Sequence, residues 1–432
     1  MTSVPVRPVR SAERRGGLWP ALLPLSAAGD PSATVETTWE HRIRFADGRV
    51  VLCGTSGLWN TNLGYGNEAI AASVFEALRS NSYAGVFRYE NPAARAAAQA
   101  LLDAAGPAYE RVIFSVSGGS ANDLVMKLVR QYHQITADPG RNLIVGLRGS
   151  YHGLTFGAHA LSGEELGQRS YGVDQQLVVH VPPNDPQALR TVMRLAGRRV
   201  AAVVVEPVLG TGAVPLTEDY LDTLLRLRGE HGYLVVADEV ATGFGRTGSY
   251  FASDGWSSPP DVLVCSKALT NGTLPASAVL TGARVARTFH ESGAVLVHAE
   301  TQAGSAVTSA AILATLQEMQ RLDAVTAGRR VARRLQSGLH ELLEREPAVR
   351  SVRGVGCMWA LEIGSESDPM PQQGVPELVR MVRAAGANTH PGPHGIQLLP
   401  ALTYTDAEVD ELLECVRNGL RQFAFRHSRA VS

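Results

Sequence analysis

The sequence reads Tyr233-Leu234-Val235-Val236-Ala237-Asp238-Glu239-Val240 and, further along, Val262-Leu263-Val264-Cys265-Ser266-Lys267. Each stretch is a short, valine-rich apolar run that ends in polar residues, which is the pattern of a buried parallel strand. In open α/β sheets, ligands bind at the carboxyl ends of such strands. The two stretches therefore predict an α/β fold in which an acid and the Lys267 amine meet at one edge of the sheet.

Lys267 and Asp238 are the predicted catalytic pair. Lys267 stands between Ser266 and Ala268, in a region with little other charge. A desolvated lysine has a lowered pKa and becomes a nucleophilic amine that can form a Schiff base. A buried carboxylate such as Asp238 suits the protonated ring nitrogen of a pyridoxal cofactor. Taken alone, a lysine after a strand is as readily a solvated strand end, so the neighbouring motifs must decide.

Length and charge narrow the class of protein. A chain of 432 residues is too long for one simple core and suggests a large domain plus a smaller one. Its formal net charge of −1 gives no electrostatic case for nucleic-acid binding. No stretch has the roughly 20 uninterrupted apolar residues of a membrane helix. We expect neither a nucleic acid nor a membrane as partner.

Cysteine usage and the N-terminus bear on the compartment. The cysteines, Cys53, Cys265, Cys357 and Cys415, are far apart in the sequence, which favours reduced, buried thiols and no metal site. An arginine pair followed by the apolar run 18–25 resembles a secretory signal, but two prolines interrupt that run. We expect a flexible arm that docks on the rest of this protein, which we expect to be cytoplasmic. A secretory signal is the alternative.

A glycine-rich turn is the candidate phosphate site. The short strand Arg111-Val112-Ile113-Phe114 leads to Ser117-Gly118-Gly119-Ser120-Ala121-Asn122, and an amphipathic helix follows. A strand, a glycine turn and a helix start together offer free backbone N–H groups to a phosphate. Ser120 or Asn122 is expected to cap the helix. Most such turns only connect elements, so the turn needs support from the other motifs.

The segment from Asp238 to Gly248 reads Asp-Glu-Val-Ala-Thr-Gly-Phe-Gly-Arg-Thr-Gly, and Ser266-Lys267-Ala268-Leu269 follows. Together they resemble the signature of the class III pyridoxal-phosphate aminotransferases, and the resemblance extends from about Gly54 to Leu402. It implies fold type I, with a large, mostly parallel seven-stranded sheet domain flanked by helices and a small α+β domain built from both chain ends. The expected boundaries are 1–30 for the arm, 31–60 for the first part of the small domain, 61–300 for the large cofactor-binding domain and 301–432 for the C-terminal small domain.

The resemblance also assigns roles around a pyridoxal phosphate cofactor. Lys267 would hold the cofactor and move the proton, Asp238 would pair with the ring nitrogen, and Tyr151 and Val240 would press on opposite faces of the ring. The remaining residues expected to bind the cofactor are Ser117, Gly118, Gly119 and Ser120 at the phosphate, His152 beside Tyr151, and Glu206 in a Glu-Pro motif. Ser120 stands where the family usually has Glu, and Ala241 where many members have Gln. Glu206 could instead contact substrate or hold an arginine.

Thr301 lies in the segment His298-Ala299-Glu300-Thr301-Gln302-Ala303-Gly304. In the family, the threonine of this segment reaches the cofactor phosphate of the neighbouring subunit. The resemblance therefore implies a homodimer with shared active sites. The simpler reading is an ordinary threonine before a helix. Further on, residues 352–362 resemble a strand of the family's small domain.

Two residues bear on the substrate. Trp59, in a segment that resembles the family's N-terminal region, is expected to contact it. Gln397 stands where many members have an arginine that grips the α-carboxylate. Burying a carboxylate without a cation is costly, unless Arg88 or Arg246 substitutes. We therefore hypothesise an amino acceptor, an aldehyde or ketone, without an adjacent carboxylate.

The substrate could be a small molecule or a peptide, and the aminotransferases of daptide-type ribosomal peptide pathways, which act on a peptide's C-terminal ketone, are one such case. Two alternatives to amino transfer stay open. One is an aminomutase, epimerase or decarboxylase of the same family, which would use the same lysine and acid. The other is a non-catalytic scaffold, for which the departures at Ser120, Ala241 and Gln397 leave room.

Overall fold

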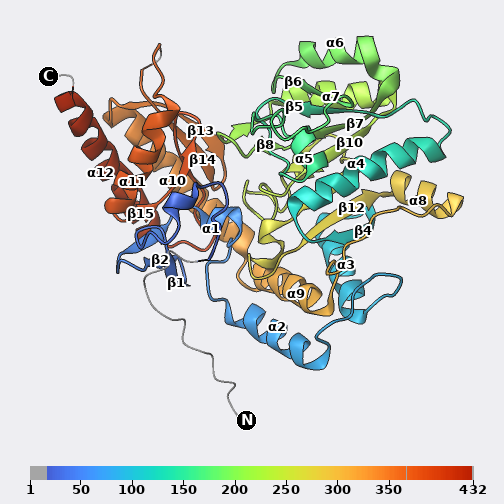
Figure 1. Ribbon diagram of the computed structural model, residues 1–432, viewed down its shortest axis with the longest axis horizontal. Helices are drawn as coiled ribbons and strands as arrows, with labels where there is room; N and C mark the ends of the chain where they lie inside the picture. The colour runs from blue at the N-terminus through green and yellow to red at the C-terminus, as the bar shows by residue number, and fades with distance from the viewer. Residues whose placement is uncertain (1–16, 366, 431–432) are drawn as a thin grey trace.

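The computed structural model describes residues 17–365 and 367–430, which form two lobes (Figure 1). The larger lobe is built on a seven-stranded sheet of order β4-β12-β11-β10-β7-β5-β6. The strands from β11 to β6 are parallel, and β12 runs antiparallel to both of its neighbours. Their bounds are β4 (Tyr109–Ser115), β5 (Leu143–Leu147), β6 (Val178–Val181), β7 (Val200–Val205), β10 (Leu234–Asp238), β11 (Val262–Cys265) and β12 (Ser277–Gly282). The predicted fold class is confirmed.

Helices cover both faces of this sheet. One core cluster joins the strands to α4 (Gly118–Ile135) and α8 (Ala283–Ser292). A second cluster joins the opposite face to α6 (Pro186–Ala196) and α7 (Glu218–His231). Every residue of β7 is consequently 0% exposed. Burial on both faces explains why the central strands are continuous apolar runs rather than alternating ones.

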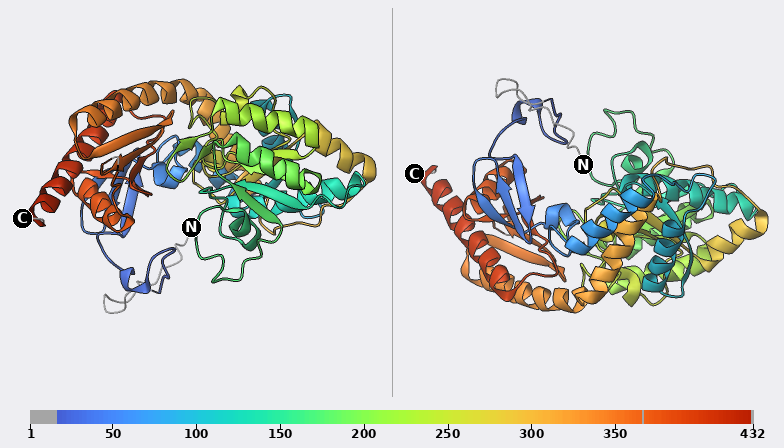
Figure 2. Two further views of the ribbon diagram at one scale, coloured as in Figure 1. Left: turned by 90° about the horizontal axis from the view of Figure 1, so that it is seen from above. Right: turned by 90° about the horizontal axis from the view of Figure 1, so that it is seen from below.

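The smaller lobe contains two four-stranded sheets, ordered β1-β2-β3-β15 and β13-β14-β17-β16. Because β15 pairs in parallel with β3, segments from both chain ends share one sheet. The views in Figure 2 show the blue N-terminal strands beside the red C-terminal helices. The strands are β1 (Val35–Trp39), β2 (Arg42–Phe45), β3 (Val50–Cys53), β13 (Val349–Val355), β14 (Met358–Ile363), β15 (Ala387–Asn388), β16 (His390–Gly392) and β17 (Gly395–Leu398), and the helices are α10 (Ala324–Arg345), α11 (Val375–Ala384) and α12 (Asp406–Ala430).

The remaining elements connect the lobes or line the site. Helix α9 packs against α2 and α3 below the large sheet (Figure 1). The other helices are α1 (Ser56–Trp59), α2 (Glu68–Ser80), α3 (Pro92–Ala105), α5 (Phe156–Leu161) and α9 (Ala306–Arg321), with the short strands β8 (Val208–Leu209) and β9 (Val214–Pro215). Short 3-10 helices are η1 (Leu25–Ala27), η2 (Gly197–Arg199), η3 (Ala252–Gly255), η4 (Lys267–Thr270) and η5 (Gln372–Gly374).

One local prediction is wrong: residues 352–362 form parts of two antiparallel strands, not one. The chain reverses between β13 and β14, where Gly356 has φ +60°. A Cβ at Gly356 would lie 2.5 Å from the Arg246 carbonyl oxygen, so only glycine fits this turn. The amide of Cys357 donates to the same carbonyl at 2.8 Å. The reversal is therefore set by a contact with a distant loop.

Residues 1–16 of the predicted N-terminal arm lie outside the described residues, and in its described part, residues 17–30, Leu18 and Trp19 are strongly exposed. The four cysteines are buried and unpaired, as predicted. Within residues 17–365 and 367–430, no helix combines the length and the apolar character needed to cross a membrane.

Candidate active site

The carboxyl ends of β10 and β11 form the floor of the candidate site. These strands are adjacent and parallel, with Asp238 paired to Val264. Asp238 ends β10 and is 2% exposed. Lys267 begins η4 just after β11 and has φ +47°, a strained conformation for a lysine. The structure thus places the predicted acid and amine at one sheet edge.

Lys267 has the environment of a nucleophilic amine. Burial lowers its pKa, although the charges of Glu206 and Asp238 act in the opposite direction. Its Nζ lies 5.0 Å from the centre of the Trp59 ring, which stabilises the ammonium form when the amine is protonated. A lysine with a lowered pKa is uncharged in a larger fraction of molecules near neutral pH, and can accept a proton or attack a carbonyl carbon.

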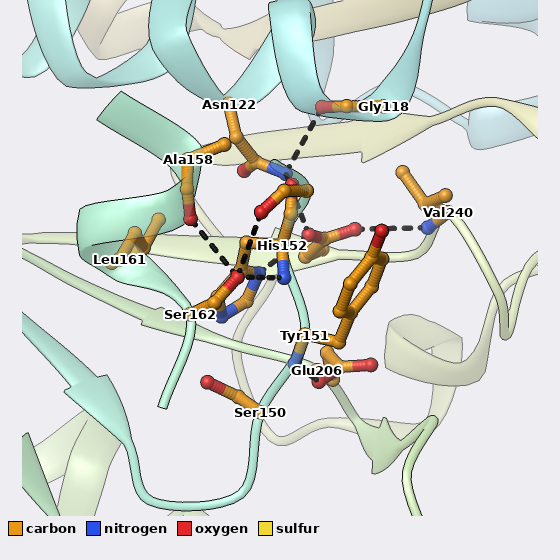
Figure 3. A network of polar contacts seen from close by, with 12 residues as sticks. Gly118, Asn122, Ser150, Tyr151, His152, Ala158, Leu161, Ser162, Glu206 and Val240 are labelled. Carbon is orange, nitrogen blue, oxygen red and sulfur yellow. Dashed lines mark hydrogen bonds and ion pairs between the residues drawn. The ribbon is translucent and has the colours of Figure 1, made fainter. Parts of the chain in front are cut away.

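The Asp238 carboxylate is fixed by three donors. Its Oδ2 accepts hydrogen bonds from Asn122 Nδ2 at 2.8 Å and from His152 Nδ1 at 2.7 Å, and its Oδ1 accepts one from the Val240 amide at 3.1 Å. Figure 3 shows this network around His152, between Asn122 and Ser162. Burial alone would lower the pKa of His152, but its hydrogen bond to Asp238 and the Asp238 charge outweigh it and raise that pKa. His152 therefore orients the carboxylate and balances its charge.

The predicted phosphate turn begins α4, but its cap is Ser117. The Ser117 Oγ accepts from the Ser120 amide at 3.1 Å, so the expectation that Ser120 or Asn122 caps the helix is wrong. Asn122 lies one turn inside α4, where its side chain reaches Asp238 and the His152 carbonyl oxygen instead. The first amides of a helix have no intrahelical acceptor, which leaves those of Gly118 and Gly119 for a ligand.

This turn is packed so closely that side chains would fill it. A Cβ at Gly118 would lie 3.1 Å from Val240 Cγ1, and one at Gly119 would lie 3.3 Å from Thr155 Oγ1. Gly153 has φ +126°, and a Cβ there would lie 2.5 Å from the Gly119 Cα. The glycines therefore keep open a backbone-lined cradle beside Asp238.

The arrangement fits pyridoxal phosphate, the cofactor that the resemblance implies. Asp238 would receive the ring nitrogen, Lys267 the aldehyde carbon, and the α4 turn the phosphate. Two buried atoms of the same network, Asn122 Oδ1 and His152 Nε2, have no hydrogen-bond partner among the described residues. Buried polar atoms in native proteins rarely lack a hydrogen-bond partner, so these two atoms are consistent with a polar ligand group beside Asp238.

Glu206 and Tyr151 form the wall nearest β7. Glu206 follows that strand, is 4% exposed, and accepts a hydrogen bond from the Tyr151 amide at 2.9 Å. Burial raises the pKa of Glu206 to about 7. The Tyr151 side chain is 38% exposed, so its ring is free to contact a ligand. Figure 3 shows the Tyr151 ring between Val240 and Glu206.

Trp59 is presented by an unusual turn. The four residues of α1 all have positive φ, from 45° at Ser56 to 66° at Leu58. A left-handed conformation costs about 1–2 kcal/mol for each residue that is not glycine. The turn is held by Ser56 Oγ, which donates to the Leu399 carbonyl oxygen at 2.6 Å and accepts from Arg246 Nη2 at 3.1 Å. The strain places the Trp59 ring beside Lys267.

Arg246, one of the two arginines considered as a carboxylate ligand, has a structural role. It is 0% exposed, and Nη1 donates to the Cys357 and Pro400 carbonyl oxygens. Nη2 donates to Ser56 Oγ and to the Asn62 side chain. Its four nitrogen–oxygen contacts join α1 to the smaller lobe and occupy both terminal nitrogens of the guanidinium, whereas the buried Nε has no hydrogen-bond partner among the described residues. The other candidate, Arg88, lies in an exposed segment over the Phe87 ring.

Gln397 is 2% exposed in β17, and its Nε2 donates to the Gly210 carbonyl oxygen at 2.7 Å. Among the described residues, no hydrogen bond or ion pair joins Thr301 to the cradle at α4. Instead, Thr301 is exposed, and its carbonyl oxygen accepts from the Tyr83 hydroxyl at 3.0 Å. A surface pocket of about 580 Å³ lies between Thr301 and the segment 83–90.

Sequence reasoning missed the site roles of three residues. Asn122 was recognised in its motif but interpreted as a helix cap. Gly210 and His390 carried no signal in the sequence. The His390 ring packs edge-on against Trp59, with 4.5 Å between ring centres, because β16 lies beside β17. Only the pairing of those two strands brings His390 to the site.

Comparison with known proteins shows the family of the chain. A family model described as Aminotransferase class-III matches residues 26–420. An acetylornithine aminotransferase from Gloeobacter violaceus is 32% identical over 371 residues, which cover 85% of this chain and 88% of that protein. A putrescine–pyruvate aminotransferase from Pseudomonas aeruginosa is 27% identical, over 88% of each chain.

Solved structures give the same result. An amine transaminase from an uncultivated Pseudomonas species, in a PLP-bound form, matches with a TM-score of 0.89 and 29% identity. The match covers 96% of this chain and 100% of that one.

Proposed function

The chain belongs to the class III aminotransferases, which use pyridoxal phosphate, and from this premise we propose that its amino acceptor is an aldehyde or ketone without a carboxylate beside the reacting carbon. Aminomutase, epimerase and decarboxylase activities are not favoured by the relatives, which are named as aminotransferases.

The observation that carries the proposal is the state of Gln397. It stands where the resemblance implies an arginine, carries no charge, and has its amide nitrogen committed to the Gly210 carbonyl oxygen. Arg246, the nearest alternative considered, is committed to four protein oxygens. Hydrogen bonds to a charged group are worth about 1.5–3 kcal/mol, so a carboxylate without such a partner would bind about 10–150-fold more weakly.

The side chains around the floor have distinct tasks in the transfer. Bound pyridoxal phosphate supplies an aldehyde carbon that takes up amines and a ring that withdraws electrons. Asp238, held by Asn122 and His152, would place its carboxylate at the ring nitrogen. The Lys267 amine would take a proton from the substrate carbon and later return it, acting as general base and then general acid. The Trp59 ring would cover one side of the amine, since its centre lies 5.0 Å from Nζ.

The proposal is tested with pyruvate and methyl isopropyl ketone, which have the same number of non-hydrogen atoms and the same branching. The protein is loaded with pyridoxamine phosphate, and the return of visible absorbance is followed in single turnovers. We expect the ketone to react and pyruvate to gain no advantage from its charge. A peptide that ends in a methyl ketone tests whether the acceptor group is carried on a larger molecule.

Two variants sharpen this test. Gln397→Arg restores a cation and should raise the rate with pyruvate, relative to the ketone, by about 10–150-fold. Gln397→Met, which adds no charge, should leave the ratio of the two rates unchanged. A wild-type protein that already prefers pyruvate by more than a hundredfold, with Gln397→Arg adding nothing, would refute the proposal.

We also propose that the active sites are completed in a homodimer. The support is the pocket that Thr301 shares with Tyr83 and Phe87, which are 53% and 52% exposed. The segment that precedes Thr301 in the chain also exposes Val295 and Val297, by 76% and 80%. Large apolar side chains gathered on one surface are typical of an interface. Sedimentation at increasing protein concentration tests the assembly, and Thr301→Ala should weaken cofactor binding only where dimers form.

We propose a cytoplasmic location as well. The support is the chain's four unpaired, buried cysteines, which suit a reducing compartment. Fractionation of cells that express the full chain is the corresponding experiment.

A further inference from the structure

Gln397 sits where the two lobes meet, in the middle of β17. Its side chain reaches from the smaller lobe to the hairpin of β8 and β9, which packs against both lobes, and donates there to the Gly210 carbonyl oxygen at 2.7 Å. Gln397 is 2% exposed and Gly210 is half-buried. A partly buried hydrogen bond of normal length between these two segments restricts how they can move relative to each other.

Gly210 connects Gln397 to Glu206 at the floor of the site. Its amide donates to Glu206 Oε2 at 2.9 Å, and a Cβ at Gly210 would lie 3.1 Å from the same oxygen. Glycine thus lets the backbone approach the buried carboxylate closely. The other oxygen, Glu206 Oε1, accepts from the Tyr151 amide at 2.9 Å. Each oxygen of Glu206 therefore holds one backbone segment.

The contacts form one continuous chain, from Gln397 through Gly210 and Glu206 to Tyr151. Tyr151 is followed directly by His152, which is bonded to Asp238 at 2.7 Å. The loop that carries the expected ring-stacking tyrosine is thus tied both to the smaller lobe and to the acid at the ring nitrogen. A shift of β17 relative to the larger lobe would move that loop.

We propose that Gln397 is a positioning residue, which acts through Gly210 and Glu206 to fix the Tyr151 loop against the cofactor. In this role Gln397 affects every substrate equally, because it sets the geometry of the cofactor site and does not contact the acceptor. The inference rests on the family's cofactor and not on which acceptor the protein uses.

The test measures cofactor binding, separately from turnover. Gln397→Met keeps the length of the side chain and removes its donor, and Glu206→Gln leaves one acceptor for two backbone amides. For each variant, the affinity of the cofactor-free protein for pyridoxal phosphate is measured by titration, and the circular dichroism of the bound cofactor is recorded. Loss of one neutral hydrogen bond should weaken binding about 3–12-fold and diminish the dichroism of the cofactor band.

A double-mutant cycle decides whether the two residues act as one chain. If they do, the double variant binds pyridoxal phosphate about as weakly as the weaker single variant. Arg334→Met removes an exposed side-chain pair with Asp410, between α10 and α12 of the smaller lobe, and should leave the dichroism unchanged. Gln397→Asn serves as a second variant that keeps a polar amide. Its side chain is too short to reach Gly210, so it should behave like Gln397→Met.

Two results would overturn the proposal. One is a set of effects that multiply in the double variant, which would mean that Gln397 and Glu206 act independently. The other is an unchanged cofactor affinity and dichroism in Gln397→Met, with a changed ratio of acceptor rates, which would make Gln397 a substrate contact. The second result is measured with Gln397→Met. It is therefore independent of the comparison of pyruvate and ketone in Gln397→Arg, which tests the proposed function.

Discussion

Glu206 provides the sharpest prediction, because its carboxyl group is buried beside another acid. Burial is the main cause that raises its pKa from 4.5 to about 7, and the nearby Asp238 charge adds to it, although His152 opposes. Each tenfold change in proton affinity is worth about 1.4 kcal/mol. The full shift therefore corresponds to about 3 kcal/mol of linkage between the protonation of Glu206 and the stability of the cofactor-free protein.

The sign follows from which state holds the proton. Folded Glu206 keeps its proton up to about pH 7, whereas the unfolded chain releases it above about pH 4.5, so stability falls as pH rises between these values. Glu206→Gln cannot ionise and lacks this dependence. We expect the free energy of unfolding of the variant, minus that of wild type, to rise by about 2–3 kcal/mol as the pH is raised from 5 to 8.

The assay is urea denaturation of the cofactor-free protein at several pH values, comparing wild type, Glu206→Gln and Glu218→Gln, an exposed control on α7. His152, Asp238 and Lys267 face Glu206 and are present in both proteins. The Glu206 charge raises the pKa of His152 and of Lys267, so the difference between the two proteins reports Glu206 together with this coupling. A wild-type-minus-variant difference that is flat across this range, or that changes in the opposite direction, would refute the assigned burial of a protonated carboxyl group.

Three further predictions concern the floor and its supports. Lys267→Ala should abolish the visible band of bound pyridoxal phosphate and all amino transfer, as measured by absorbance with an amine donor; a persisting, amine-sensitive band would contradict the assigned role. Arg246→Met should lower the free energy of unfolding by about 3–5 kcal/mol in urea denaturation, because it leaves buried carbonyl oxygens without a donor. The control Arg226→Met, on an exposed helix face, should change it by less than about 0.5 kcal/mol. Gly153→Ala should weaken pyridoxal phosphate binding at least tenfold in a titration, because its Cβ would lie 2.5 Å from Gly119; an unchanged affinity would show that the cradle tolerates the side chain.

The central sheet was predictable because burial on both faces leaves a local signature. β7, β10 and β11 are apolar runs with polar residues at their carboxyl ends, and short strands of this kind need no distant information to be recognised. The same argument placed Asp238 and Lys267 together. The reversal between β13 and β14 was not predictable in this way, since a backbone contact from Arg246 fixes it.

Polar contacts over long sequence separations were beyond the sequence. Asn122 was interpreted as a cap because capping is the commonest local use of an asparagine at a helix start. In the structure, Ser117 already caps α4, which frees Asn122 for Asp238, more than a hundred residues away. The position of Gln397 predicts a substrate contact because it resembles that of an arginine, and this stays a prediction; its hydrogen bond to Gly210 appears only after the lobes pack.

The sequence by itself determined the family, the fold class and the chemical pair Lys267 and Asp238, because strand patterns and motifs are carried by neighbouring residues. The tertiary structure alone decided which groups hold that pair in place: the Asn122 and His152 donors on Asp238, the strained turn that brings Trp59 to Lys267, and the chain from Gln397 to Glu206. The physical reason is that hydrogen bonds between distant segments depend on how the lobes pack, and packing has no local pattern in the sequence.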